Sequence, residues 1–135
     1  MTQDRQPGPD DLLAMMPYAL ALGVELHEAT PSLTTGSLAW SAERCTAGGI
    51  LHGGAIMSLA DTVGAVCAFL NLPSGASTAT IDSTTRVYRP LRSGTLHGSA
   101  RPTHVGRTVV VVATDLTDDD GRLVAQTSQA QAVSA

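Results

Sequence analysis

The sequence contains no lysine, and all eight of its basic residues are arginines. Aromatic residues make up 3% of the chain and charged residues 15%, below the usual quarter. Nucleic-acid binding relies on basic stripes and stacking aromatic side chains, so we expect no nucleic-acid partner for a chain with a net charge of −4. Without lysine there is also no P-loop. An anionic ligand would have to be bound by a few arginines or by backbone N–H groups.

Cysteine is scarce as well, since only Cys45 and Cys67 are present, and this indicates neither a disulfide framework nor a zinc site. We interpret both as small buried hydrophobic residues. His97 and His104 lie seven positions apart and no carboxylate accompanies them, so we expect no metal ion and no cofactor. The run Asp118–Asp120 is interpreted as a solvated turn, because no further acceptors follow it at the spacing of a calcium loop.

Membrane and export signals are also missing from the sequence. The first residues, MTQDRQPGPDD, are acidic and rich in proline, which is the opposite of a signal peptide. We find no apolar run of the ~18–20 residues that a membrane span needs. The sequence therefore predicts a soluble, cytoplasmic protein without a membrane partner.

The length of 135 residues corresponds to one domain. We expect an N-terminal arm and a short helix in residues 1–17, with Asp10 or Asp11 as the N-cap, and a single domain in residues 18–135. β-branched residues between Val24 and Ser41 predict two strands or one bent hairpin. We place the break between them at Thr35-Gly36. The many small apolar residues favour burial of further surface against a second copy of the chain.

The strongest predicted helix runs from Gly53 to Leu70 and is apolar on nearly every face, so we expect it to be buried. Four strands are predicted after it, at residues 78–88, 95–102, 107–116 and 122–133. The last two are joined by a tight turn in which Gly121 supplies a positive φ. A curved antiparallel sheet wrapped around one central helix is an α+β fold.

Asp61 lies inside this apolar helix, with no arginine within a helical turn. A buried carboxylate is costly, so Asp61 either faces a pocket, a partner chain or a substrate, or accepts hydrogen bonds from hydroxyls such as that of Ser58. Gly53 and Gly54 begin the helix, where free N–H groups and the helix dipole suit an oxyanion. Because Asp61 follows Gly53 by eight residues, the two cannot easily reach one carbonyl. A site shared between antiparallel helices of a dimer is favoured.

These motifs resemble the hotdog-fold acyl-CoA thioesterases of the phenylacetate-pathway (PaaI-like) type. The resemblance extends from Leu20 to Val133 and is most specific in GILHGGA at residues 49–55, followed by Leu59-Ala60-Asp61. Weaker matches are STATIDSTTRVYRP ending at Pro90, HVGRT at residues 104–108 and DGRLVAQT at residues 120–127. The resemblance implies a hotdog fold, in which an antiparallel sheet wraps around one long central helix, and a homodimer or homotetramer.

The resemblance also implies the chemistry of the site. The Gly53 N–H would bind the thioester carbonyl oxygen, and His52 would shape the site near it. Asp61 of the facing subunit would act as general base on water or as a nucleophile that forms a transient anhydride. Thr80 would orient the attacking water. Many relatives carry an amide six residues before the histidine, where this chain has Thr46.

The remaining predicted contacts belong to the two ends of the substrate. We expect the acyl part to contact residues near the catalytic group: Gly54, Thr62, Ala65, Ile81 and Asp82. The CoA part is expected to lie on the surface, at Arg89, Arg92, Gly106, Arg107 and Thr108. The predicted function is hydrolysis of a short-chain, medium-chain or aryl acyl-CoA to the free acid and CoA.

Two alternatives stay open at this point. A binding module that holds an acyl-CoA without turnover is favoured by Thr46, because its hydroxyl is shorter than an amide and donates only one hydrogen. An enoyl-CoA hydratase or dehydratase on the same fold is disfavoured, because such relatives place an Asp and a His together in a loop before the helix. Here Asp61 lies two turns inside the helix.

Overall fold

The computed structural model describes residues 7–135, which form one sheet, one long helix and several short helices. The short helices are α1 (Pro9–Ala14), α2 (Pro17–Leu22) and the 3₁₀ turns η1 (Ala42–Arg44) and η2 (Ala47–Gly49). The long helix is α3 (Gly53–Leu70). The strands are β1 (Glu25–Ala29), β2 (Thr34–Ala39), β3 (Ser77–Val87), β4 (Thr95–Val105), β5 (Val109–Thr117) and β6 (Leu123–Ser134).

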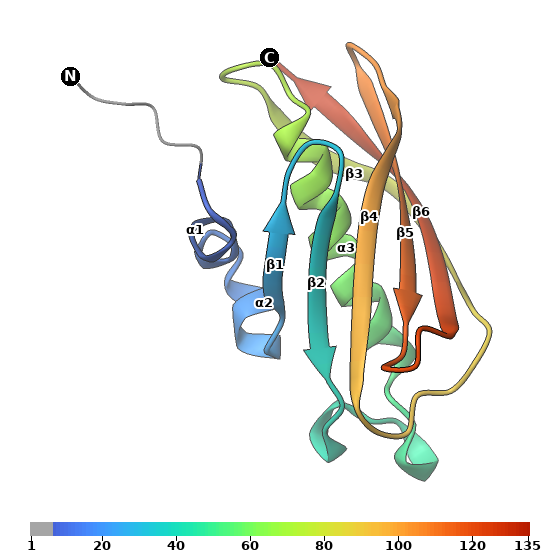
Figure 1. Cartoon of the computed structure of the whole chain (residues 1–135). Helices are drawn as coiled ribbons and strands as arrows, with labels where there is room; N and C mark the ends of the chain where they lie inside the picture. The colour runs from blue at the N-terminus through green and yellow to red at the C-terminus, as the bar shows by residue number, and fades with distance from the viewer. Residues whose placement is uncertain (1–6) are drawn as a thin grey trace.

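The six strands form a single antiparallel sheet in the order β1-β2-β4-β5-β6-β3. The sheet curves around α3, which lies along its inner face (Figure 1). The hydrophobic core fills the space between them and includes Leu38, Leu59, Val63, Leu96 and Leu116, each fully buried. The predicted α+β arrangement of one sheet around one helix is confirmed. Gly121 has a φ of 78° in the β5–β6 turn, as predicted.

Helix α3 begins and ends at the predicted residues. The His52 side chain caps it at the N-terminus, and Asn71 ends it. Contrary to the sequence expectation, α3 is long and apolar enough to cross a membrane by length and composition alone. The rest of the chain buries 56% of it, which is the packing of a core helix. The helix is not buried on every face, because Met57, Asp61 and Phe69 are exposed.

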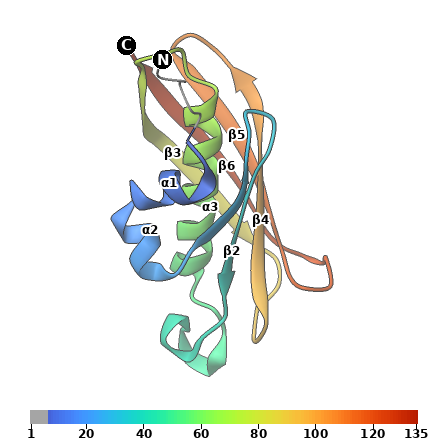
Figure 2. The same cartoon turned by 60° about the vertical axis from the view of Figure 1, so that its left-hand side comes forward.

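The N-terminal segment contains two helices where one was predicted. Gly8, and neither Asp10 nor Asp11, is the N-cap of α1; Asp11 instead accepts a hydrogen bond from the Gly8 N–H through Oδ2 at 3.1 Å. Helix α2 begins at Pro17, so the predicted domain boundary falls inside this region. Figure 2 shows α1 and α2 on one side of α3 and strand β4 on the other. The first six residues of the predicted arm lie outside the described residues.

Strands β1 and β2 form the predicted hairpin, but the turn lies at residues 30–33 and not at Thr35-Gly36. Gly36 is part of β2, where a Cβ would come within 2.7 Å of Val63 Cγ1 and 2.9 Å of the Glu25 carbonyl oxygen. The absence of a side chain lets α3 cross close to the sheet at this position. Gly36 therefore serves packing and does not end a strand.

Strand β3 is an edge of the sheet and pairs only with β6 among the described strands. Its register shifts between Thr80 and Asp82, because Thr80 pairs with Gln131 and Asp82 with Ala130. Ile81 is therefore the extra residue of a β-bulge. Nearly all of the strand is exposed along its 11 residues.

Candidate active site

The N-terminus of α3 presents one free backbone N–H group. The His52 Nδ1 atom accepts a hydrogen bond from the Gly54 N–H at 2.8 Å, and the His52 carbonyl accepts from the Ala55 and Ile56 N–H groups. In the part of the chain that the structure describes, the Gly53 N–H has no acceptor. Gly53 is exposed, and a Cβ placed there would meet nothing within 4 Å. Among these amides, Gly53 is therefore the one that a ligand oxygen can approach, with the helix dipole behind it.

The same hydrogen bond determines the tautomer of His52. Because Nδ1 accepts a hydrogen bond from the Gly54 amide, the ring hydrogen of neutral His52 is carried by Nε2. His52 is exposed, so this N–H can donate to a ligand at the helix end. Gly54, in contrast, has its N–H occupied by the capping bond.

Asp61 lies two turns along α3 and is exposed, within reach of β3 and β6. The Thr80 hydroxyl donates to its Oδ1 at 3.4 Å, and the Gln129 side-chain amide donates to the same oxygen at 3.3 Å. An open pocket of about 270 Å³ surrounds the carboxylate. The other residues that line it are Tyr18, Met57, Ser58, Thr62 and Ser83. The structure thus brings together Asp61, Thr80 and Thr62 of the predicted site.

A second layer of hydrogen bonds lies behind Thr80. The Gln131 amide donates to the Thr80 hydroxyl oxygen at 2.9 Å and accepts from the Thr78 hydroxyl at 3.2 Å. Gln131 is 1% exposed, so the Thr80 hydroxyl is held by a hydrogen bond from a buried side chain. The Thr80 hydroxyl accepts from one side and directs its hydrogen to Asp61.

The bulge at Ile81 decides which residues of β3 face this pocket. Residues directly opposite in an antiparallel pair lie on the same face of the sheet. Thr80 and Ser83 are opposite Gln131 and Gln129, which point toward α3, whereas Asp82 is opposite Ala130 and lies on the outer face. Ser83 therefore lines the Asp61 pocket where Asp82 was predicted. The predicted contact Ile81 is exposed at the bulge itself.

A separate apolar cavity of about 190 Å³ lies one turn further along α3. Ala65, a predicted substrate contact, lines it together with Leu12, Met15, Met16, Val66, Phe69 and Thr78. Helix α1 forms its other wall, and none of the residues 7–135 that line it is charged. This cavity is suited to an apolar group.

Gly53 and Asp61 are not brought together within one chain. Eight residues of α-helix at 1.5 Å each separate their backbones by about 12 Å. A single carbonyl group cannot contact both. Thr46 is exposed in the loop before α3, where its N–H donates to the Ile50 carbonyl at 2.8 Å.

The five predicted CoA contacts are divided between two ends of the sheet. Arg89 and Arg92 lie in the β3–β4 connection, where Arg92 Nη1 donates to the Gly48 carbonyl at 3.4 Å, beside the loop that leads into α3. Gly106, Arg107 and Thr108 form the β4–β5 hairpin at the opposite end (Figure 1). One chain does not bring all five together.

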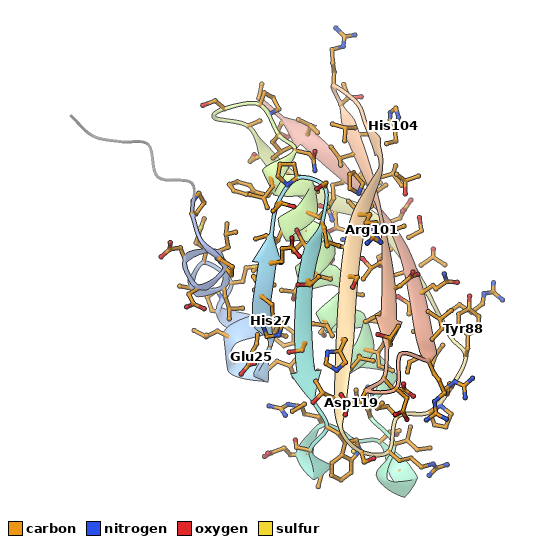
Figure 3. The ribbon with its side chains drawn as sticks, viewed as in Figure 1. Glu25, His27, Tyr88, Arg101, His104 and Asp119 are labelled. Atoms are coloured by element: carbon orange, nitrogen blue, oxygen red, sulfur yellow. The ribbon has the colours of Figure 1, made fainter. Side chains whose placement is uncertain are left out.

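His97 has a carboxylate partner after all, because its Nε2 lies 2.7 Å from Asp119 Oδ1. The sequence did not reveal this contact since 22 residues separate them. His104 lies at the other end of the sheet from Asp119 (Figure 3). No group of three His, Cys, Asp or Glu side chains that could hold a metal ion occurs among residues 7–135. Cys67 is fully buried, and burial raises the pKa of its thiol, while Cys45 is half-buried.

Sequence reasoning missed Gln129, Gln131, Ser83 and Tyr18. The alternation of the two glutamines with alanines in β6 was a signal that they share one face. It did not indicate which face is buried. Ser83 depends on the bulge and Tyr18 on the docking of α2, neither of which has a local sequence signal.

Residues 48–125, more than half of the chain, match the model of the Thioesterase superfamily, and the chain belongs to this superfamily. An esterase candidate of Mycobacterium tuberculosis is 29% identical over 127 residues, which are 90% of this chain and 91% of that protein. The proofreading thioesterase EntH of Klebsiella pneumoniae is 37% identical over 59 residues, 44% of this chain and 43% of that enzyme.

Solved structures agree in fold. A thioesterase from Haemophilus influenzae superposes with a TM-score of 0.90 at 24% identity, covering 99% of this chain and 95% of that chain. A mutant thioesterase from Pseudomonas aeruginosa gives a TM-score of 0.89 at 26% identity, covering 96% of each chain. The predicted hotdog fold is confirmed, and the protein is a thioester hydrolase.

Proposed function

We propose that the protein hydrolyses acyl-CoA thioesters with Asp61 as general base and the Gly53 N–H as oxyanion donor. The proposal rests on two features of the described chain. Asp61 is an exposed carboxylate that accepts from two donors, and the Gly53 N–H at the start of the same helix has no acceptor. Both are needed for addition of water to a carbonyl carbon, because one group activates the water and the other binds the oxyanion.

A twofold dimer would complete this site. Strand β3 is a long exposed edge, and Ile81 and Val87 on it are large exposed apolar residues. Such an edge is available for pairing with another strand. Antiparallel pairing of two β3 edges would place two α3 helices side by side in opposite directions. Gly53, Met57 and Asp61 follow one another at intervals of four residues, so a twofold axis level with Met57 would bring each Asp61 to the Gly53 of the other chain.

The proposed reaction proceeds in two steps. Asp61 removes a proton from water, the resulting hydroxide adds to the thioester carbon, and the carbonyl oxygen becomes an oxyanion that accepts from the Gly53 N–H. The tetrahedral intermediate then expels the CoA thiolate, which takes the proton back from Asp61 and leaves as the thiol. A nucleophilic route through a mixed anhydride uses the same residues. Neither route requires a metal ion or a cofactor.

The cavity beside Ala65 supports an apolar acyl group. It lies one helical turn from Asp61, and the flexible Met15 and Met16 side chains on its wall can adapt to different acyl shapes. This supports a short-chain, medium-chain or aryl acyl-CoA as substrate. In the proposed dimer, Arg107 of one chain would approach the helix end near Arg92 of the other, which would gather the CoA contacts. A cytoplasmic location stays a prediction.

Release of free CoA thiol from a panel of acyl-CoAs tests the proposal. Asp61→Asn removes the base while keeping the side-chain shape, and we expect the rate to fall by about 10²–10⁴-fold. A wild-type rate in Asp61→Asn would show that Asp61 is not the base. Asp82→Asn is the matched control, since Asp82 lies on the other face of the same sheet edge.

Mixed dimers test whether the site is shared. Gly53→Pro removes the oxyanion donor and Asp61→Asn removes the base, and each homodimer should be inactive. A mixed dimer of the two contains one intact site, so an equal mixture of reassociated chains should regain about a quarter of the wild-type rate. No recovery in dimers shown by mass to be mixed would contradict a shared site.

One observation favours a second candidate, a module that binds acyl-CoA without turnover. Thr46 is exposed near the helix end, and no side-chain hydrogen bond of this residue is seen in the described chain. A hydroxyl is a shorter donor than an amide there. Calorimetric binding of acyl-CoA with no thiol release would favour this candidate.

A further inference from the structure

We infer that Gln129 is a positioning residue for Asp61, which it holds through Oδ1 so that Oδ2 is presented to water. This inference rests on the proposed function of Asp61 as the base. It assigns a role to a buried side chain on β6.

Burial of the Gln129 side-chain amide costs folding free energy unless its hydrogen bonds compensate for it. The residue is 0% exposed, its Nε2 donates to Asp61 Oδ1 at 3.3 Å, and its Oε1 is buried with no partner in the described chain. An unsatisfied buried carbonyl destabilises a fold, and an apolar side chain of similar size would avoid that cost. The amide is therefore retained for its single hydrogen bond, which goes to the carboxylate.

The orientation of the amide follows from its partner. An ionised carboxylate only accepts hydrogen bonds, so the Gln129 side chain must turn its NH₂ group toward Asp61. The oxygen then points at Gly64 of α3, where a Cβ would overlap it. Gly64 thus makes the space in which the Gln129 amide lies flat against the helix.

A second donor on the same oxygen completes the arrangement. Gln131 donates to the Thr80 hydroxyl oxygen at 2.9 Å, which leaves the single Thr80 hydrogen to be directed at Asp61 Oδ1. With Gln129, two donors meet on Oδ1. The carboxylate is therefore fixed in rotation, and Oδ2 is the oxygen left for the reaction.

The other groups around Asp61 carry no charge: α2 contributes Tyr18, α3 contributes Met57, Ser58 and Thr62, and β3 contributes Thr80 and Ser83. In the described chain no salt bridge involves Asp61. The Thr80 hydroxyl and the Gln129 amide are therefore the contacts that orient the carboxylate.

Gln129→Met tests the inference, because methionine keeps the size of glutamine and removes the donor. We expect kcat for acyl-CoA hydrolysis to fall roughly 10-fold to 100-fold with little change in KM, since a charge-assisted hydrogen bond is lost. Gln126→Met is the matched control: Gln126 lies on the same strand but bonds to Asp115 and Tyr88.

A wild-type kcat in Gln129→Met, with Asp61→Asn inactive, would overturn the inference and leave the proposed function intact. Full activity of Asp61→Asn would instead refute the proposed function. The NMR chemical shift of the Asp61 carboxyl carbon reads the contact without turnover: it should change in Gln129→Met, and an unchanged chemical shift overturns the inference. If Gln129→Met does not fold, Gln131→Met serves the same tests through Thr80.

Discussion

Gly64 of α3 and the side-chain amide of Gln129 on β6 lie so close that no side chain fits between them. Gly64 is in the middle of the longest helix, where glycine costs about 1 kcal/mol relative to alanine. The cost is offset only if the amide has to be there. The glycine in α3 thus leaves room for the β6 amide that donates to Asp61.

Gly64→Ala should therefore destabilise the protein despite the better helix propensity of alanine. We expect a loss of about 1–3 kcal/mol in the free energy of unfolding, because the methyl group displaces a buried amide. Gly64→Ala combined with Gln129→Ala should lose less than the sum of the two single changes, since the smaller side chain relieves the clash. Urea unfolding of the four proteins measures this coupling. Strict additivity would contradict the close approach.

Gly53→Pro separates the role of the Gly53 N–H from the role of the helix. Proline is well accepted at the first position of a helix, and His52 already has the extended backbone, φ −60° and ψ 135°, that a following proline requires. The variant should fold normally while kcat falls about 10²–10³-fold, the usual effect of removing an oxyanion donor. Gly53→Ala keeps the N–H and has free space for its methyl group, so it should stay active. Equal activity of both variants would exclude this donor.

Met57→Arg should separate the proposed dimer. Met57 is 46% exposed on the face that carries Gly53 and Asp61, and a twofold axis at its level would place two arginines against each other. We expect a shift to monomers in analytical ultracentrifugation and a parallel loss of hydrolysis. Leu20→Arg is the control, because Leu20 is also exposed, at 55%, but lies on α2. A dimeric and active Met57→Arg protein would place the axis elsewhere.

Asp118 should make the free energy of unfolding decrease at acid pH. Partial burial by itself raises the pKa of this carboxyl, but hydrogen bonds from the Arg122 and Asp120 N–H groups and from the Arg122 guanidinium lower it below its ordinary value. A lowered folded-state pKa means that the stabilisation is present above the ordinary pKa of about 3.9 and is lost as pH falls through the folded-state value. Urea unfolding should show Asp118→Asn less stable than wild type at pH 7, with the gap closing at acid pH. Asp120→Asn, at an exposed position, should show little effect at either pH.

The elements whose signals are local were predictable from the sequence, and those decided by tertiary contacts were not. Helix α3 was predicted to the residue, because a histidine and two glycines begin it and Asn71 and Pro73 follow it. Gly36 was misread as a break, since only the passage of α3 over β2 explains a glycine inside that strand. The cap of α1 was misplaced because Asp11 stabilises the helix from its third position, not from the N-cap.

The candidate site, like the fold, was predictable only where a residue stands out in its local sequence. Asp61 is conspicuous as a carboxylate in an apolar helix, and Gly53 as a glycine at its start. The glutamines of β6 were not, because alternation shows which residues share a face without showing which face is covered. Their role depends on a strand 68 residues from Asp61.

The bulge at Ile81 also acts as a one-residue spacer in the electrostatics of the site. Without it, the alternation of β3 would turn Asp82 toward α3, beside Asp61. A second carboxylate there would place two like charges side by side, which disfavours the ionised form that a general base needs. Forcing Ile81 into a regular pair would therefore add a carboxylate to the site, whereas deleting Ile81 would keep Asp82 opposite Ala130 on the outer face, which makes the pairing of this one residue a determinant of the reaction.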